Sequence, residues 1–218
     1  MDYAHFNTKD GERKTPTAHL NRPNISDKLQ RLRESAFERS IPTADDETLS
    51  FLITLLSALQ PENILELGTA TGISGIAMLD ICPRAHLTTV EKNTDFFEEA
   101  KANFKCFGMN MRVNAINGDA GEVIQVLSGT YDFIFMDCAK VQYIKYLPTL
   151  KKLLARGGAL LADDILLFGW ITGEAEIPKK RKMLAQHICE YVQAVTDDRE
   201  LSTTIINIGD GLALSVKR

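Results

Sequence analysis

Acidic side chains stand where several apolar stretches of this sequence end. The residues at or just after those ends are Glu66, Glu91, Asp119, Asp137 and the pair Asp163–Asp164. An aspartate after a strand is commonly a turn former or a helix cap, which explains one or two of them. The carboxyl ends of parallel strands meet at one edge of a sheet, where ligands bind. Five acidic ends therefore predict a functional edge, with cationic or hydroxyl partners that offset the repulsion between like charges.

The turn after the first of these stretches is the most informative segment. Residues 63–74 read Asn-Ile-Leu-Glu-Leu-Gly-Thr-Ala-Thr-Gly-Ile-Ser, which predicts a buried strand, a glycine turn and a helix. Free N–H groups at such a helix start suit a polar or anionic ligand. We expect Gly68 to let the ligand approach the backbone, because a Cβ would be in the way. A dinucleotide fingerprint would need a further glycine at Ala70, and Glu66 suits an amine better than a phosphate.

Three further side chains are expected around the same ligand. Glu91 follows Gly68 by 23 residues, at the end of the second strand. A carboxylate at that place accepts hydrogen bonds from both hydroxyls of a ribose. Asp119, between Gly118 and Ala120, is placed to hold an adenine amino group. Ser74 could bond a carboxylate of the ligand, although an ordinary role at the helix terminus fits nearly as well.

A second group of residues suggests a metal and a base. Asp137, Asp163 and Asp164 come together if the fourth and fifth strands are neighbours. Three carboxylates without His or Cys favour magnesium, manganese or calcium over zinc. Lys140 follows Asp137 by three residues. A lysine beside a metal ion has its pKa lowered and can act as a general base, whereas a solvated surface lysine is the alternative.

The elements that must position these residues alternate along the chain. The patterns predict helices over about 26–39 and 45–60 and then parallel strands at 64–67, 87–90, 111–116, 131–136 and 159–162. Helices between them are expected at 73–81, 94–107, 122–127 and 143–154, the last of which is closed by Gly157 and Gly158. A helix over 178–195 precedes two strands, 203–208 and 212–216, which Gly209-Asp210-Gly211 joins as a hairpin. The fold class is therefore α/β, with a mostly parallel seven-stranded sheet and a C-terminal antiparallel hairpin.

Composition limits the remaining possibilities. The chain has 218 residues, of which 44% are hydrophobic and 25% charged, which is typical of a soluble globular protein. We predict a flexible N-terminal arm at 1–24 and one domain at 25–218, in which 25–60 form N-terminal helices. No apolar run is long enough for a membrane span, and the polar N-terminus favours a cytoplasmic protein. The net charge of −4 argues against a wholly basic nucleic-acid binder. The four cysteines lack metal-binding spacing and are expected to be free and buried.

Five motifs, in their order and spacing, resemble the metal-dependent O-methyltransferases, the family of the catechol and caffeoyl-coenzyme A enzymes. They are Glu66–Gly72, Val90-Glu91, Gly118–Ala120, Phe135–Lys140 and Ala162–Ile165. The resemblance implies a Rossmann-like fold with S-adenosylmethionine (SAM) and Mg²⁺, or another hard divalent cation, as cofactors. It implies SAM-binding residues Glu66, Gly68, Gly72, Ser74, Glu91, Gly118, Asp119, Ala120 and Asp137. It further implies metal ligands Asp137, Asp163 and Asp164, with Lys140 and Asp137 as the catalytic pair. The family usually has Asn where this chain has Asp164, which makes that ligand the least certain.

The closing segment Ile208–Leu214 and the basic run Lys179–Lys182 look most like one bacterial branch, the tRNA 5-hydroxyuridine methyltransferases. That resemblance predicts tRNA processing by methylation of 5-hydroxyuridine. The alternatives are O-methylation of a small catechol-like phenol, which also presents two adjacent oxygens, and a catalytically silent SAM-binding protein. The basic run could bind phosphates or could simply be a charged helix surface. A homodimer is expected from the resemblance.

Overall fold

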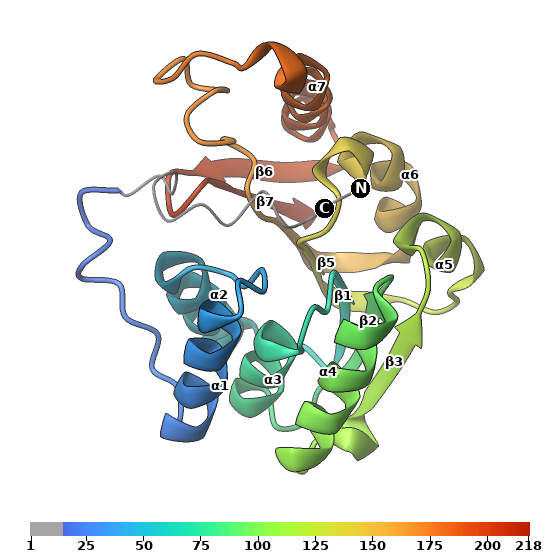
Figure 1. Ribbon diagram of the computed structural model, residues 1–218. Helices are drawn as coiled ribbons and strands as arrows, with labels where there is room; N and C mark the ends of the chain where they lie inside the picture. Colours follow the sequence, from blue (N-terminus) through green and yellow to red (C-terminus); the bar gives the residue numbers. More distant parts are fainter. Residues whose placement is uncertain (1–14) are drawn as a thin grey trace.

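The computed structural model describes residues 15–218 and contains one seven-stranded sheet (Figure 1). The strand order is β3-β2-β1-β4-β5-β7-β6. The strands are β1 (Asn63–Leu67), β2 (His86–Glu91), β3 (Val113–Asn117), β4 (Tyr131–Met136), β5 (Leu154–Ala162), β6 (Leu201–Ile206) and β7 (Leu212–Lys217). Pairing is parallel from β3 through β5, and β7 runs antiparallel to both β5 and β6. The predicted fold class is confirmed, and β4 is the central strand of the sheet, with β1 and β5 on either side of it.

Helices cover both faces of the sheet (Figure 1). One hydrophobic core contains residues of α1 (Asp27–Glu38), α2 (Asp46–Leu59), α3 (Ile73–Ile81) and α4 (Thr94–Cys106). The other core contains residues of α5 (Ala120–Val126), α6 (Tyr143–Leu153) and α7 (Lys182–Asp197). Strand β4 supplies Phe133 and Phe135 to the first core and Ile134 and Met136 to the second. A strand segment buried on both faces is apolar, which explains the run at 133–136.

Side-chain caps begin three of the helices, α1, α2 and α4, close to the starts that the sequence patterns predict. Ser26 accepts a hydrogen bond from Leu29 N at the start of α1. Asp45 does the same for Thr48 N at α2, and Asn93 caps α4. Such caps satisfy N–H groups that have no partner within the helix. The starts of the two N-terminal helices are therefore determined by local hydrogen bonds.

Several element boundaries differ from the prediction, including those of β6, which spans Leu201–Ile206 rather than 203–208. Strand β3 begins at Val113, because residues 110–112 form a 3₁₀ turn, η2, in which Met111 is 85% exposed. Strand β5 begins at Leu154, and Gly157 and Gly158 lie inside it rather than closing α6. The register of its pairing with β4 shifts between Tyr131 and Phe133. Gly157 and Gly158 therefore lie in an irregularity of strand β5. Helix α7 begins at Lys182, after the 3₁₀ turn η4 (Lys179–Arg181).

The segment before α1 contacts the start of α2. Thr15 Oγ1 and Asn21 Nδ2 both donate to the buried carboxylate of Glu47. Of the flexible arm predicted at 1–24, residues 1–14 lie outside the described part of the chain. Within 15–218, no helix is long and apolar enough to cross a membrane. All four cysteines are free, but Cys106 and Cys189 are exposed, so the prediction that all four are buried is wrong.

Candidate functional site

The glycine turn between β1 and α3 has the strand–turn–helix geometry that its sequence predicts. Gly68 has φ +101° and Gly72, which precedes α3, has φ +86°. A Cβ on Gly68 would lie 1.8 Å from the carbonyl oxygen of Asp137. The backbone that follows β4 therefore leaves no room for a Cβ, so this position requires glycine. The physical reason differs from the predicted one, which was approach by a ligand.

Glu66 lies beneath this turn and is completely buried. Ser74 Oγ donates to its Oε1 at 2.5 Å, and Thr89 Oγ1 donates to its Oε2 at 2.6 Å. The carboxylate therefore links the start of α3 to β2. In this arrangement the Ser74 hydroxyl proton is directed at Glu66.

Burial raises the pKa of the Glu66 carboxyl from 4.5 to about 7, because the two hydroxyl hydrogen bonds only partly offset desolvation. The unfolded chain then ionises Glu66 at lower pH than the folded chain does. The free energy of unfolding should consequently fall as pH rises from about 4.5 to about 7, by about 3 kcal/mol from this residue. Glu66→Gln is expected to remove that decline, as measured by urea unfolding at pH 5 and pH 8. The exposed Glu62→Gln is the control, and an unchanged pH profile in Glu66→Gln would contradict the assignment.

Glu91 and Asp119 lie at the carboxyl ends of adjacent strands. Glu91 Oε2 accepts from Ala70 N at 2.8 Å and its Oε1 accepts from Asn93 N at 2.7 Å. Burial raises the pKa of its carboxyl. Its side chain is thereby held against the glycine turn.

Asp119 begins helix α5, and its Oδ1 accepts from Gly121 N at 2.9 Å. Its Oδ2 pairs with Lys92 Nζ at 2.9 Å, and this lysine hydrogen bond lowers the pKa of the Asp119 carboxyl. Gly118 N donates to Glu91 O at 3.0 Å, which joins the segment Gly118–Ala120 to the end of β2. The predicted cofactor residues around Glu91 and Asp119 therefore share one edge of the sheet.

A lysine and three aspartates gather where β4 and β5 end. Lys140 Nζ lies 2.7 Å from Asp137 Oδ1 and 2.7 Å from Asp164 Oδ2. Asp163 is 3% exposed, and its Oδ1 accepts from Asp164 N at 2.7 Å. Burial alone would lower the pKa of Lys140, but Asp137 and Asp164 outweigh it and raise that pKa well above its usual value. Burial and the neighbouring carboxylates likewise raise the pKa of Asp163.

These residues match a divalent cation in donor type and in charge. Three carboxylates and one ammonium leave a net charge of −2 when all are ionised, and carboxylate oxygens are ligands for hard cations. Within residues 15–218, however, no three acidic, His or Cys side chains already converge on a metal position. Lys140 Nζ stands between two of the carboxylates instead. Binding of a metal ion there requires the ammonium to move.

Two residues that the sequence analysis missed support this edge. Thr71 Oγ1 is buried and has no hydrogen-bond partner. It borders a cavity of about 20 Å³ between residues 42–44 and the glycine turn. Tyr143 Oη donates to Met136 O at 2.9 Å and to Asp163 O at 3.2 Å, which ties the ends of β4 and β5 together. Its place three residues after Lys140, at the start of α6, is the signal that could have identified it.

Known proteins share both the sequence pattern and the fold. A family model described as O-methyltransferase matches residues 21–218. A Staphylococcus aureus structure provisionally named a caffeoyl-CoA O-methyltransferase has TM-score 0.81 and 31% identity, over 93% of this chain and 95% of that chain. The caffeoyl-CoA O-methyltransferase of Populus kitakamiensis is 26% identical over 207 residues, covering 88% of this chain and 87% of its own. The flavonoid 3',5'-methyltransferase of Vitis vinifera is 27% identical over 208 residues, with the same coverage.

The family match includes the glycine turn, the carboxylates around it and the cluster at Lys140. The fold agrees with that match, because the Staphylococcus aureus structure superposes on nearly the whole chain with TM-score 0.81. This chain therefore belongs to the O-methyltransferase family and is a SAM-dependent O-methyltransferase.

Proposed function

We propose that this enzyme transfers the methyl group of SAM to one hydroxyl of a small catechol-like phenol, in a reaction that depends on a divalent metal ion. The observation that carries the proposal is the cluster of Lys140 with Asp137, Asp163 and Asp164 beside the glycine turn. Relatives named for caffeoyl-CoA and flavonoid substrates support a phenolic acceptor. A phenol with two adjacent hydroxyls offers two oxygens to one metal ion.

The SAM site would be formed by the edge that runs from the glycine turn to Asp119. Glu91 would accept the ribose hydroxyls, and Asp119 would hold the adenine amino group. The remaining proposed contacts are Glu66, Gly68, Gly72, Ser74, Gly118, Ala120 and Asp137. The present cavity of about 20 Å³ has room for roughly one water molecule. Admission of the methionine part of SAM therefore requires displacement of Pro42–Ala44, which form one wall.

The buried hydroxyl of Thr71 fits a polar ligand, because an unpartnered hydroxyl is otherwise costly. Thr71→Val should weaken SAM binding about 10-fold while leaving the unfolding free energy equal or higher. Titration calorimetry with SAM and urea unfolding measure the two effects. Thr204→Val, at an exposed position of β6, is the matched control. Unchanged SAM affinity in Thr71→Val would remove this residue from the site.

Asp137, Asp163 and Asp164 would hold the metal ion. When bound, the ion would lower the pKa of the acceptor hydroxyl and fix the direction of its oxygen. Lys140 Nζ would receive the hydroxyl proton once its own proton has been released. The acceptor oxygen then forms a bond to the sulfonium methyl carbon as the carbon–sulfur bond breaks, and S-adenosylhomocysteine leaves. Positioning of the two reactants contributes much of the rate.

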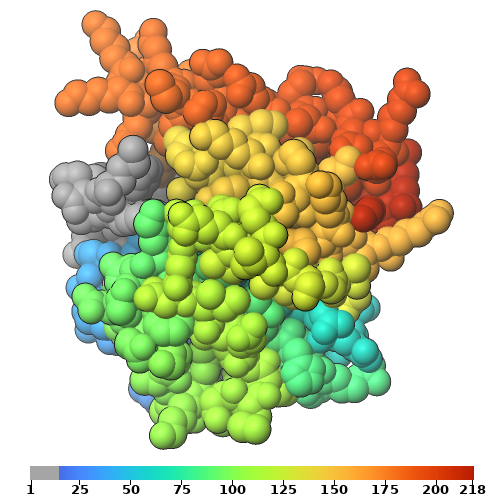
Figure 2. Space-filling model, turned by 90° about the vertical axis from the view of Figure 1, so that its right-hand side faces the viewer, coloured from blue at the N-terminus to red at the C-terminus, as the bar shows by residue number. Residues whose placement is uncertain are grey.

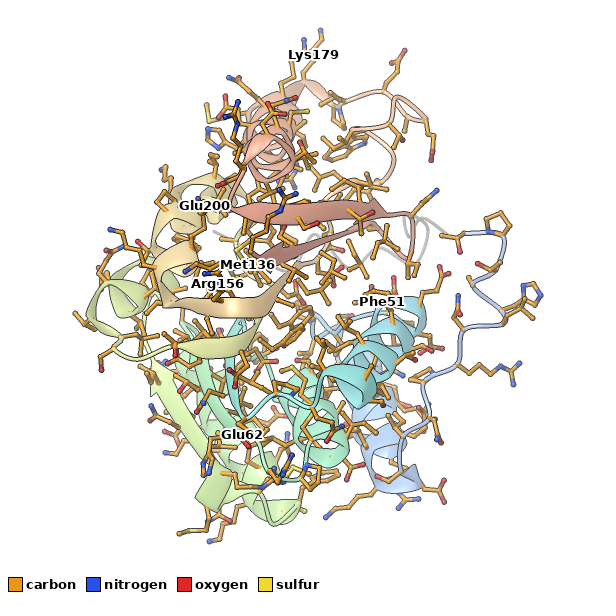
Figure 3. The ribbon with its side chains drawn as sticks, turned by 180° about the vertical axis from the view of Figure 1, so that it is seen from behind. Phe51, Glu62, Met136, Arg156, Lys179 and Glu200 are labelled. Carbon is orange, nitrogen blue, oxygen red and sulfur yellow. The ribbon has the colours of Figure 1, made fainter. Side chains whose placement is uncertain are left out.

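A second candidate acceptor is 5-hydroxyuridine in tRNA, and one observation favours it. Lys179, Lys180 and Lys182 are all exposed. The segment around residue 180 stands out from the surface in Figure 2 (orange). Figure 3 places Lys179 at the outer end of the molecule, far from Met136 at the end of β4. Such a cluster would contact phosphates of a large substrate rather than the reacting nucleoside.

The deciding experiment offers labelled SAM and Mg²⁺ with either a catechol panel or tRNA that bears 5-hydroxyuridine. Label in catechols, abolished by a chelator and by Asp137→Ala, is the expected result. Label in tRNA alone would replace the phenol with the nucleoside. Label in neither, with SAM still bound, would favour a catalytically silent SAM-binding protein. Turnover that survives the chelator would contradict the metal requirement.

The oligomeric state and the cellular location of the enzyme are also proposals. We propose that the enzyme is a homodimer, on the basis of the family resemblance, and that it acts in the cytoplasm. Sedimentation of the purified protein tests the first point, and a monomer at micromolar concentration would contradict it.

A further inference from the structure

The loop that follows β5 has an unfavourable backbone conformation. Asp164, Leu167 and Phe168 have φ values of +57°, +47° and +58°. The left-handed region is unfavourable for residues with a Cβ, although Asp and Asn adopt it more readily than others. Such conformations persist only where surrounding contacts impose them. Something outside the loop must therefore hold residues 164–168 in place.

The turn of the C-terminal hairpin supplies those contacts. Gly211 O accepts from Ile165 N at 3.0 Å, and Asp210 O accepts from Leu166 N at 2.8 Å. The carboxylate of Asp210 accepts from Phe168 N at 2.5 Å. Three backbone N–H groups of the loop thus donate to two residues of the turn between β6 and β7. Asp210 is only 9% exposed, so its carboxylate lies in the protein interior.

Tight packing reinforces these hydrogen bonds. Gly211 has φ +91°, and a Cβ there would lie 2.2 Å from Leu166 Cγ. The side chain of Leu166 therefore fills the space that glycine leaves open. Gly211 thus lets the hairpin turn approach the loop closely.

The loop joins the carboxylate cluster to a pair of aromatic rings. Its first residue, Asp164, pairs with Lys140 at 2.7 Å. Its end carries Phe168 and Trp170, whose ring centroids are 5.3 Å apart at 56°. Both rings are partly exposed. Partly exposed aromatic rings on the loop that carries Asp164 suit the flat face of an aromatic acceptor.

We propose that Asp210 is a positioning residue that fixes this loop and thereby places Phe168 and Trp170 for acceptor binding. The proposal rests on the proposed methyl transfer to an aromatic acceptor. It assigns a role to the segment Ile208–Leu214, which stands far from the reacting groups along the chain. Asp210 acts through the backbone of Phe168 and contacts no substrate itself.

The test uses the single tryptophan of the chain, Trp170, as a reporter of the loop. Asp210→Ala removes the acceptor of the Phe168 N–H, and Asp210→Asn keeps an oxygen that can accept it. We expect Asp210→Ala to shift Trp170 emission to longer wavelength and to increase its quenching by acrylamide. The KM for the acceptor should rise about 10-fold while SAM affinity stays within about twofold. Asp210→Asn should restore most of both properties.

Asp132→Ala is the matched control. Asp132 also accepts hydrogen bonds from backbone N–H groups, those of Glu62 and Asn63, but at the start of β1 rather than in the loop after β5. It should leave Trp170 emission and the acceptor KM unchanged. Unaltered Trp170 emission in Asp210→Ala would overturn the proposal, as would altered emission with an unchanged acceptor KM.

The emission measurement needs no acceptor. Should the wild-type enzyme methylate no aromatic compound, the proposed function fails, and with it the acceptor-binding role of the loop. The emission of Asp210→Ala then still decides whether Asp210 holds the loop. The two failures are therefore distinguishable.

Discussion

A Gly68→Ala variant is expected to lose at least about 3 kcal/mol of unfolding free energy, and with it SAM binding. Gly68 has φ +101°, and the added Cβ would lie 1.8 Å from the carbonyl oxygen of Asp137. That oxygen belongs to the backbone and cannot turn aside as a flexible side chain can. Relief requires the glycine turn to separate from the end of β4. Urea unfolding and SAM titration measure the two losses.

Gly129→Ala is the matched control for this prediction. Gly129 has φ +88°, but its added Cβ would meet no atom within 4 Å. This variant carries only the backbone cost of a left-handed alanine, about 1 to 2 kcal/mol. The difference between the two variants isolates the collision with Asp137. Equal stability losses would show that the backbone relaxes freely at Gly68.

Replacement of Lys140 by methionine is expected to lower kcat at least about 100-fold, the usual range for loss of a general base. The same change should strengthen Mn²⁺ binding, because the ammonium 2.7 Å from both Asp137 and Asp164 competes with a cation. Opposite changes in turnover and metal affinity would distinguish a base from a simple counter-ion. Steady-state kinetics and metal titration provide both measurements.

Lys145→Met serves as the control, since Lys145 is an exposed lysine on the same α6 helix that follows Lys140. It should leave kcat and Mn²⁺ affinity near the wild-type values. Near-normal turnover in Lys140→Met, with tighter metal binding, would reassign Lys140 as a counter-ion. Thermal unfolding of both variants separates these effects from loss of fold.

Most of the fold could be predicted from local patterns. The helix starts near residues 26 and 45 and the apolar run of β4 are visible in the sequence, and the structure confirms them. The start of β5 could not be predicted, because Gly157 and Gly158 usually end a helix. Their place in an irregular strand depends on pairing with Tyr131 and Phe133, which are distant along the chain.

The candidate site, too, could be predicted from the sequence only in part. Acidic residues at strand ends predicted which side chains would share the edge, because parallel strands bring their carboxyl ends together. The partners of each carboxylate could not be predicted, since hydrogen bonds such as Glu66 with Thr89 join separate strands. The unpartnered hydroxyl of Thr71 and the bridging hydroxyl of Tyr143 likewise depend on what lies around them.

The sequence by itself determined the α/β class, the strand order along the chain and the residue types that could bind SAM and a metal ion. Period and spacing are local properties, so they can be read without coordinates. Only the tertiary structure decided that Gly68 faces the Asp137 carbonyl, that Lys140 lies between two aspartates and that Asp210 holds the loop of Trp170. Each of these contacts joins segments whose proximity follows from the packing of the whole sheet, which no single stretch of sequence encodes.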